Sequence, residues 1–314
     1  MAVAVVSWNT RDLLDRCLRS LEPDANRGLT EVWVVDNASD DGSAELVRER
    51  FGWVHLIASE TNLGFGRAVN AVAERTESEW IATANADIAL RPGALDALLE
   101  AGNRDPRAGA IAPRLLLPDG EAQHSVFAFP TIPWAIALNV QAYRVSRRIG
   151  DWMAMPGYWD STRARRVPWA IAAFLLVRRS AWDQIGGFDE RQWMYAEDLD
   201  LGWRLHRAGW ATRYEPRAPV DHASAAATKQ AFGEELAPVW QRSTYGFMAR
   251  RYGMGRTWTV AGLNLAGSGL RWLAMAPLAL ARPRRYRARH QALGRWVLVH
   301  ARALHGRATL EGYR

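Results

Sequence analysis

The sequence predicts an α/β fold, in which a doubly wound, mostly parallel sheet carries helices on both faces and a basic helical region follows it. Short apolar runs alternate with helical patterns through the first half of the 314 residues, as they do in chains built from βαβ units. Residues 241–314 contain 14 arginines and a single acid, Glu311. We therefore expect one globular domain over residues 1–240 and a basic amphipathic helical region over residues 241–314.

Five strands are expected in the first half of the chain, because five short apolar runs each end in turn or loop residues. They cover residues 3–6, 32–35, 54–57, 80–84 and 110–112. Thr10 can cap the first helix, and Pro92 suits the first turn of the helix that precedes the fifth strand. Cys17 shares one helical face with leucines at positions 14, 18 and 21, which predicts that it belongs to the core.

The second half of the chain is less regular. Residues 118–166 hold many Pro, Trp and Arg residues with weak periodicity, and irregular segments this long in a compact domain are usually functional. A hydrophobic strand is expected over residues 169–177, followed by a helix closed by Gly186 and Gly187. A further short strand is expected over residues 211–216.

Charge is distributed unevenly along the chain. Residues 241–314 carry a net charge of +13, the remainder carries −6, and the whole chain carries +7. A basic tail of this kind indicates an anionic partner, either a membrane surface or nucleic acid.

Within this tail, an apolar run over residues 257–281 is followed by RPRRYRAR. The run is long enough to cross a bilayer, but Arg271 near its middle, its glycines and its proline weaken that interpretation. Clustered arginines beside Trp and Leu fit a segment that lies on anionic lipid, and packing within a soluble protein is the remaining alternative. We expect peripheral membrane contact and no nucleic acid partner.

The compartment is predicted from two features. Cys17 is the single cysteine of the sequence, which excludes an intrachain disulfide and a cysteine-based zinc site. The opening residues MAVAVVSW lead directly into a strand and lack the basic start of a secretory signal. Together these features predict a reducing, cytoplasmic setting.

Polar residues that directly follow the predicted strands are candidate ligand contacts, because ligands bind beyond the carboxyl ends of the strands in such sheets. These residues are Ser7, Asn9, Asp36, Asn37, Asn85 and Asp87. Asp36 can accept hydrogen bonds from a ribose or a base. It can equally form an Asx-turn with Ser39 or Asp40.

Asp87 suggests a divalent cation, because it supplies a hard oxygen ligand at the end of a buried strand. Mg²⁺ or Mn²⁺ takes one or two protein carboxylates together with substrate phosphates, and Mn²⁺ also accepts an imidazole such as that of His222. Both residues have the ordinary structural alternatives of a lone aspartate or a lone histidine.

A nicotinamide enzyme is disfavoured. Its G-x-G-x-x-G loop should follow the first strand, where this chain reads VVSWNTRD without a glycine. Gly64 and Gly66 follow the third strand and lack a third glycine, so a tight turn explains them as well.

Three acids stand close together in MYAEDLDLGWRLHRAGW, residues 194–210. Glu197, Asp198 and Asp200 can offset the positive end of a helix dipole. Alternatively, one of them is a catalytic carboxylate at the wall of a pocket. The residues alone leave both hypotheses open.

Taken in order, these segments resemble the bacterial family 2 glycosyltransferases, which have the GT-A fold, a Rossmann-like sheet with helices on both faces. The resemblance covers about residues 3–226 and is carried by VVSWN, VVDNASDDGS, NLGFGRAVN, NADIAL, WAIAAFLLVRRSAW, GGFDE, MYAEDLDL, AGW and DHASAA. It is strongest to rhamnosyltransferase-like members that act on lipid-linked envelope glycans. It implies an inverting, metal-dependent glycosyltransferase of cell-envelope polysaccharide synthesis.

The resemblance also implies a role for each group of residues. Asp198 is the expected base, Glu197 shares acceptor binding, and Asp87 and His222 hold Mg²⁺ or Mn²⁺. The implied contacts to a nucleotide-diphosphate sugar are Ser7, Asn9, Asp36, Asn62, Gly66, Arg67 and Asn85. The implied acceptor contacts, on the side of the 118–166 insertion, are Gly187, Phe188, Trp193 and Tyr195. The acceptor would be a glycan or a polyprenyl-diphosphate-linked sugar, and the enzyme would lie on the inner face of the cell membrane.

Two positions depart from the family pattern. Asn85 stands where the first acid of the metal motif is expected, which leaves Asp87 as the single carboxylate. Ala172 and Ala173 stand where relatives usually have Gly-Ala, which bears on the identity of the sugar more than on the class of reaction.

Two other classes of function are alternatives to a glycosyltransferase. A nucleotidyltransferase on a similar sheet needs a phosphate-binding loop rich in Gly, Arg or Lys after the first strand, and SWNTRD does not supply one. A non-catalytic protein that binds nucleotide sugars or nucleic acid has no need of Asp87, Asp198 and His222 together.

Overall fold

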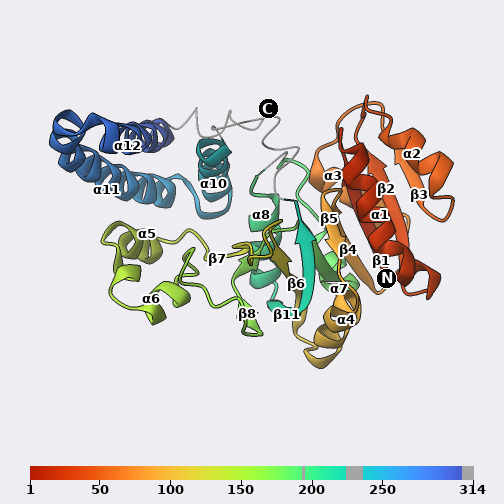
Figure 1. The fold of residues 1–314 in the computed structure, drawn as a ribbon. Coiled ribbons are helices and arrows are strands. Elements are labelled where there is room, and N and C mark those ends of the chain that lie inside the picture. The colour runs from red at the N-terminus through yellow and green to blue at the C-terminus, as the bar shows by residue number, and fades with distance from the viewer. Residues whose placement is uncertain (193–194, 224–235, 306–314) are drawn as a thin grey trace. The chain divides into compact units, whose positions relative to one another are not determined.

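The computed structural model describes residues 1–192, 195–223 and 236–305. The chain forms two compact units, one made of Met1–Phe127 and Asp160–Gly233 and the other of Ala128–Trp159 and Glu234–Arg314. Figure 1 shows the ribbon of both. The middle of the 118–166 segment therefore groups with the C-terminal helices.

The first unit is built on a mixed, mostly parallel sheet with the strand order β3-β2-β1-β4-β10-β6-β11-β5, with β8 added beside β11. Strands β10, β5 and β8 run antiparallel to their neighbours, and the other pairs are parallel. The strands are β1 (Ala2–Ser7), β2 (Glu31–Asp36), β3 (His55–Ala58), β4 (Trp80–Asn85), β5 (Ile88–Leu90), β6 (Ala108–Leu116), β8 (Arg165–Val167), β10 (Phe174–Arg178) and β11 (Ala211–His222). A small antiparallel sheet pairs β7 (Val126–Phe127) with β9 (Trp169–Ala170).

The described residues of this unit also form the helices α1 (Arg11–Asn26), α2 (Ser43–Arg50), α3 (Phe65–Ala73), α4 (Ala94–Arg104), α7 (Arg179–Ile185) and α8 (Glu197–Arg207). One hydrophobic core joins α1, α2 and α4 to the sheet, and Cys17 is buried in it as expected. The chain moves outward from β1 to β3 and then returns to β4 on the other side of β1. This reversal makes a topological switch point between β1 and β4, where ligands bind in α/β sheets.

The first five expected strands are confirmed, but the one expected over residues 169–177 is broken. Residues 171–173 lie between β9 and β10, which belong to different sheets. The break has a tertiary cause: Ser125 O accepts from the backbone N–H of Ile171, and Thr83 Oγ1 donates to Ala172 O at 2.7 Å. An unbroken apolar run does not reveal these partners.

Two expected helix starts also differ. Thr10 occupies the N-cap position of α1, but its hydroxyl lies 3.0 Å from Ser7 Oγ and makes no capping bond. The helix after Pro92 begins at Ala94, with Gly93 at the N-cap in a left-handed conformation (φ 78°). The strand expected over residues 211–216 continues to His222.

The second unit is helical. It contains α5 (Ile132–Asn139), a 3₁₀ turn η1 (Ala142–Arg144), α6 (Arg147–Trp152), α10 (Leu236–Tyr252), α11 (Met254–Ala281) and α12 (Pro283–Ala303). The 118–166 segment is thus more regular than its sequence suggests. Among the described helices, none combines the length and the apolar character needed to cross a membrane.

A chain of hydrogen bonds links four helices of this unit. The Tyr245 hydroxyl lies 2.8 Å from His300 Nδ1 and accepts from Asn264 Nδ2 at 3.0 Å. Asn139 Nδ2 donates to Asn264 Oδ1 at 2.7 Å, and Arg271 donates to Asn139 Oδ1 at 3.2 Å. Because buried polar groups are costly when unpaired, this network fixes how α5 packs against the C-terminal helices.

His300 gives this unit a pH-dependent stability. Burial, with a smaller contribution from the charge of Arg271, lowers its pKa to about 4. Folding therefore favours the neutral imidazole. The contribution of His300 to the free energy of unfolding is fully present above its unfolded pKa of about 6.5 and is lost as the pH falls towards 4. The expected loss is up to about 3 kcal/mol. Urea unfolding at several pH values measures it.

The matched comparison is between His300→Gln, which removes the titrating group, and His305→Gln, which removes an exposed histidine just beyond α12. The first variant should flatten the pH dependence of the unfolding free energy between pH 4 and 6.5, and the second should leave it as in the parent. Equal slopes in all three proteins would contradict the role given to His300.

Candidate functional site

One end of the candidate site is formed at the carboxyl ends of β1 and β2. Asp36 is buried, and its Oδ2 accepts the N–H of Ser39 at 3.1 Å, so the local hydrogen bond to Ser39 considered from the sequence is present. Its other oxygen, Oδ1, is buried without a hydrogen-bond partner among the described residues. The same carboxylate can therefore shape the loop and accept a bond from a ligand, because an unpaired buried acceptor is costly.

Asn9 and Ser7 hold the neighbouring loop. Asn9 has a positive φ of 52°, its Oδ1 accepts the N–H of Asp40 at 2.9 Å, and its own N–H donates to Ser39 Oγ. Ser7 is fully buried at the end of β1. Asn9 therefore binds protein atoms that brace the Asp36 loop, which is an indirect contribution to a ligand site.

The segment 62–70 packs against the loop that follows α7. Asn62 Oδ1 accepts the N–H of Gly64 in an Asx-turn, and Arg67 Nε lies 3.5 Å from Glu190 Oε2. A Cβ on Gly66 would lie 2.9 Å from Phe188 Cβ, so the glycine is required by close packing. These two glycines and Arg67 are placed mainly by contacts within the protein.

Asn70 holds this loop and was not among the expected site residues. Its Nδ2 donates to Phe188 O at 3.0 Å, and its Oδ1 accepts the N–H of Phe188 at 2.9 Å. Gly187 has a φ of 65°, and a Cβ there would lie 2.6 Å from Asn70 Oδ1. Asn70 is the last residue of NLGFGRAVN, so the motif contained the signal, although nothing local showed its partner.

One expected acceptor residue, Phe188, is placed differently from expectation. Phe188 is buried against Phe65 and Trp182 at ring-centroid distances of 5.8 and 5.6 Å, so its ring anchors the loop and presents no face to a sugar. Trp193 lies outside the described residues. Tyr195 is half-buried with a φ of 56°, at the start of the turn into α8.

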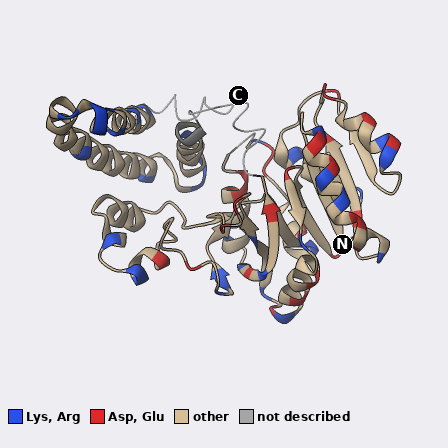
Figure 2. Ribbon diagram, in the orientation of Figure 1, with Lys and Arg blue, Asp and Glu red and all other residues tan. Residues whose placement is uncertain are grey.

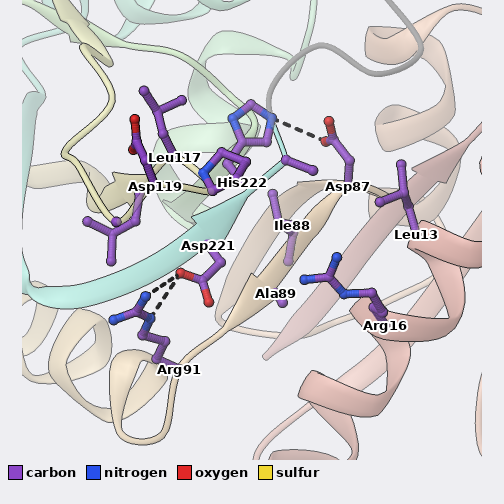
Figure 3. A pocket seen from close by; sticks show the side chains of 14 residues that line it. Leu13, Arg16, Asp87, Ile88, Ala89, Arg91, Leu117, Asp119, Asp221 and His222 are labelled. Carbon is purple, nitrogen blue, oxygen red and sulfur yellow. Dashed lines mark hydrogen bonds and ion pairs between the residues drawn. The ribbon is translucent and has the colours of Figure 1, made fainter.

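Asp87 and His222 come together as a pair. Asp87 follows β4, His222 ends β11, and His222 Nε2 lies 3.2 Å from Asp87 Oδ1. Figure 3 shows both side chains on the wall of a pocket of about 390 Å³. Arg16 from α1 and the ion pair of Arg91 with Asp221 line the same pocket.

Gln123 orients the imidazole of this pair, and sequence reasoning missed it. Its Oε1 lies 2.6 Å from His222 Nδ1. A carbonyl oxygen at this distance favours the tautomer with the proton on Nδ1, which leaves the lone pair of Nε2 directed at Asp87. Nε2 is buried, and no described residue hydrogen-bonds to it with favourable geometry.

The oxygen of Asp87 and the nitrogen of His222 fit a divalent cation that also has ligands from outside the protein. An aspartate oxygen, an imidazole nitrogen without a hydrogen bond and a hydrogen-bonded outer partner are the usual parts of such a site. In the described part of the chain, no group of three or more His, Cys, Asp or Glu side chains is arranged to hold a metal. Asp87 and His222 alone therefore require phosphate oxygens and water to complete a shell, as Mg²⁺ does with nucleotides.

Glu197 and Asp198 open α8 next to a strained turn. Ala196, at the N-cap, has a φ of 123°, which is unfavourable for a residue with a Cβ. Asp198 Oδ1 accepts the N–H of Leu199 at 2.8 Å, and the backbone N–H of Ala172 also bonds to this carboxylate. Glu197 Oε2 is buried without a hydrogen-bond partner among the described residues. Strain of this kind is found where a site must hold groups in place.

Burial raises the pKa of both carboxyl groups. The charge of Asp198 raises the pKa of Glu197 further, and backbone N–H groups offset part of the rise at both carboxyl groups. Glu197 is therefore the first of the two to take up a proton, and Asp198 carries the negative charge of the pair. Asp200 is separate: it is buried and forms an ion pair with Arg204 at 2.7 Å, which is a structural role.

Residues 171–173 connect the two halves of the site. Thr83 Oγ1 donates to Ala172 O, and the N–H of Asn85 donates to Ala173 O at 2.8 Å, while Ala172 N–H bonds to Asp198. Asp87 follows Asn85 by two residues. This short path places Asp87 and Asp198 at the same edge of the sheet, although Asp198 does not line the pocket of Figure 3.

Two solved structures share this fold. The mannosyltransferase PcManGT from Pyrobaculum calidifontis, solved with GDP-Man and Mn²⁺, superposes with a TM-score of 0.60 at 18% identity and covers 98% of this chain and 87% of that one. GalNAc-T7, solved with UDP, GalNAc and Mn²⁺, gives a TM-score of 0.54 at 15% identity and covers 80% of this chain and 51% of that one. The fold and the polar edge at its switch point define a GT-A-type protein.

Sequence comparison gives the family. Models of Glycosyl transferase family 2 and Glycosyl transferase family group 2 match residues 2–153 and 123–301. N-acetylglucosaminyl-diphospho-decaprenol L-rhamnosyltransferase of Mycobacterium tuberculosis is 35% identical over 293 residues, which cover 83% of this chain and 89% of that protein. Rhamnosyltransferase WbbL of Escherichia coli is 34% identical over 86 residues, 27% of this chain and 32% of that protein. The chain belongs to glycosyltransferase family 2, and it is a glycosyltransferase.

Proposed function

We propose that this protein is an inverting, metal-dependent glycosyltransferase of cell-envelope polysaccharide synthesis. It moves a sugar from a nucleotide-diphosphate donor to a polyprenyl-diphosphate-linked glycan. The sugar that we propose is L-rhamnose. The observation that carries the proposal is the placement of the Asp87–His222 pair and the neighbouring acids Glu197 and Asp198 at one edge of the sheet. The similarity to a relative named for L-rhamnose transfer to a decaprenyl-diphosphate acceptor supports the choice of substrates.

The donor nucleotide lies at the switch point between β1 and β4. Asp36 Oδ1, which is buried and unpartnered, accepts a hydrogen bond from the ribose or the base. The loops of residues 7–9 and 37–41 are braced against each other, so the nucleotide meets a preformed surface. Asn85, at the end of β4, borders the diphosphate.

Asp198 acts as the general base. Its carboxylate is fixed by two backbone N–H groups and carries the charge of the acidic pair, so it accepts the proton of the acceptor hydroxyl as the new glycosidic bond forms. Protonated Glu197 donates a hydrogen bond to the acceptor. Attack at the anomeric carbon and departure of the nucleoside diphosphate occur in one displacement, which inverts the configuration. Holding both sugars in line supplies much of the acceleration.

Asp87 and His222 would hold Mg²⁺ or Mn²⁺ together with the donor phosphates. When bound, the cation neutralises the charge that develops on the departing diphosphate. Gln123 keeps the imidazole in the tautomer that can ligate.

The proposal includes the location at which the protein acts, which is a membrane surface. Helices α10–α12 carry arginines and no acids, a composition that suits the anionic cytoplasmic leaflet of a membrane. Contact there would bring the active site to a lipid-linked acceptor.

The test is a transfer assay with the purified chain, Mn²⁺, a panel of nucleotide sugars and a short-chain polyprenyl-diphosphate N-acetylglucosamine acceptor. We expect one donor both to raise the melting temperature and to yield a product whose new linkage has the opposite anomeric configuration by NMR. Retention of configuration would contradict the mechanism. Donor-induced stabilisation without transfer to any acceptor would favour a non-catalytic binding protein, and pyrophosphate release from a nucleoside triphosphate would favour a nucleotidyltransferase.

A further inference from the structure

Exposed large hydrophobic side chains gather in the second unit. Of the twelve found among the described residues, eleven lie in this unit, and Trp8 alone lies in the first. Single exposed apolar residues are ordinary on protein surfaces, whereas a concentration of them marks a binding surface.

The strongest concentration is on α11. Between positions 266 and 281 every exposed residue of this helix is apolar. These residues, which we term the α11 apolar face, are Ala266, Leu270, Leu273, Ala274, Pro277, Leu278, Leu280 and Ala281. Leu270, Leu273 and Leu280 follow the spacing that puts side chains on one side of a helix, and Leu280 is 84% exposed. The face runs about 24 Å along the helix at 1.5 Å per residue.

Arginines begin where the apolar face ends. Five exposed ones, which we term the arginine cluster, occupy the junction of the helices and the start of α12: Arg282, Arg284, Arg285, Arg287 and Arg289. None of the five pairs with an acid among the described residues. Figure 2 shows blue without red along α10, α11 and α12, in keeping with the absence of Asp and Glu between residues 236 and 305 of the sequence.

We propose that the α11 apolar face and the arginine cluster bind the surface of a membrane that contains anionic lipid. The apolar face lies in the plane of the interface at the acyl boundary, and the guanidinium groups contact lipid phosphates. The charges favour this occupant over a second copy of the chain, because a second copy brings the same unpaired arginines and no acids from these helices. The proposal specifies the membrane contact suggested above and does not depend on glycosyl transfer.

The experiment measures flotation of the full chain with vesicles, without donor or acceptor. Vesicles of phosphatidylcholine mixed with phosphatidylglycerol should bind it strongly, and vesicles of phosphatidylcholine alone should bind it weakly. The double variant Leu273→Gln/Leu280→Gln should lower the partition coefficient on mixed vesicles at least about tenfold, because two side chains leave the interface. The triple variant Arg284→Gln/Arg285→Gln/Arg287→Gln should reduce the preference for anionic lipid and the sensitivity of binding to salt.

Matched controls separate surface binding from general effects of charge and folding. Arg48→Gln/Arg50→Gln removes exposed arginines from α2 in the first unit and should leave flotation unchanged. Circular dichroism melting of the leucine variant should match the parent, because the replaced side chains are exposed. The proposal is overturned if the parent does not float with anionic vesicles, or if the leucine variant floats as well as the parent. It is also overturned if the leucine pair instead controls a concentration-dependent dimer in lipid-free solution. A failed transfer assay alters none of these outcomes.

Discussion

Replacing Asp198 with asparagine is expected to lower sugar transfer by roughly 10²- to 10⁴-fold, while binding of the nucleotide sugar stays close to that of the parent. The asparagine keeps the shape of the side chain and can still accept the backbone N–H groups of Leu199 and Ala172. It cannot take up the proton of the acceptor hydroxyl. Turnover and donor affinity, measured separately by product formation and calorimetry, distinguish a lost base from a lost binding group.

Glu197→Gln is the matched comparison. Burial and the neighbouring charge raise the pKa of Glu197 to about 8, so we expect Glu197 to be neutral near pH 7, and glutamine resembles that form closely. We expect this variant to keep most of its activity. If Glu197→Gln is as damaging as Asp198→Asn, the charge of the pair resides on Glu197 and the assignment of the base is reversed.

The pH profile follows from the same pair. The base works only when ionised, so activity is lost as the pH falls through the pKa of Asp198. Burial raises that pKa, and the acid limb of the profile should therefore lie above the value of about 4 that is ordinary for aspartate. In Glu197→Gln the limb should stay in place, because the removed group was neutral over this range.

The sheet could be predicted because each of its main strands is visible in its own stretch of sequence, as an apolar run that ends in polar residues. The same local rule found Asp36 and Asn85, which end their strands, and Asp87, which lies two residues beyond β4. It failed at residues 171–173, where the run is equally apolar but Ser125, Thr83 and Asn85 hold the backbone away from a continuous ladder. Hydrophobic periodicity carries no information about such partners.

The residues that position the site were not predictable for a related reason. Gln123 contacts His222 across 99 residues of sequence, and Asn70 contacts Phe188 across 118. Both are ordinary amides, and their roles depend on which loops the fold brings together. The grouping of residues 128–159 with the C-terminal helices rests in part on one such contact, between Asn139 and Asn264.

Replacing Asp87 with asparagine is expected to weaken Mn²⁺ binding in the presence of nucleoside diphosphate by more than about 100-fold, because changes to outer partners alone cost 10- to 100-fold. Titration of Mn²⁺ followed by the EPR signal of the free ion, with each common nucleoside diphosphate in turn, reports binding without any assay of transfer. Asp221→Asn is the matched control. Asp221 lines the same pocket but pairs with Arg91 at 2.8 Å, so its loss should leave the titration unchanged.

Variants of Gln123 test whether the imidazole of His222 belongs to the Mn²⁺ site of Asp87. In Gln123→Leu the carboxylate of Asp87 and the ring of His222 remain, but the acceptor for Nδ1–H is removed. The ring is then free to place its proton on Nε2, and Mn²⁺ binding should fall about 10- to 100-fold. Gln123→Glu retains an acceptor at this position and should preserve binding. If Gln123→Leu binds Mn²⁺ as the parent does while Asp87→Asn does not, Asp87 holds the cation without His222, and the 3.2 Å contact of the two side chains is structural.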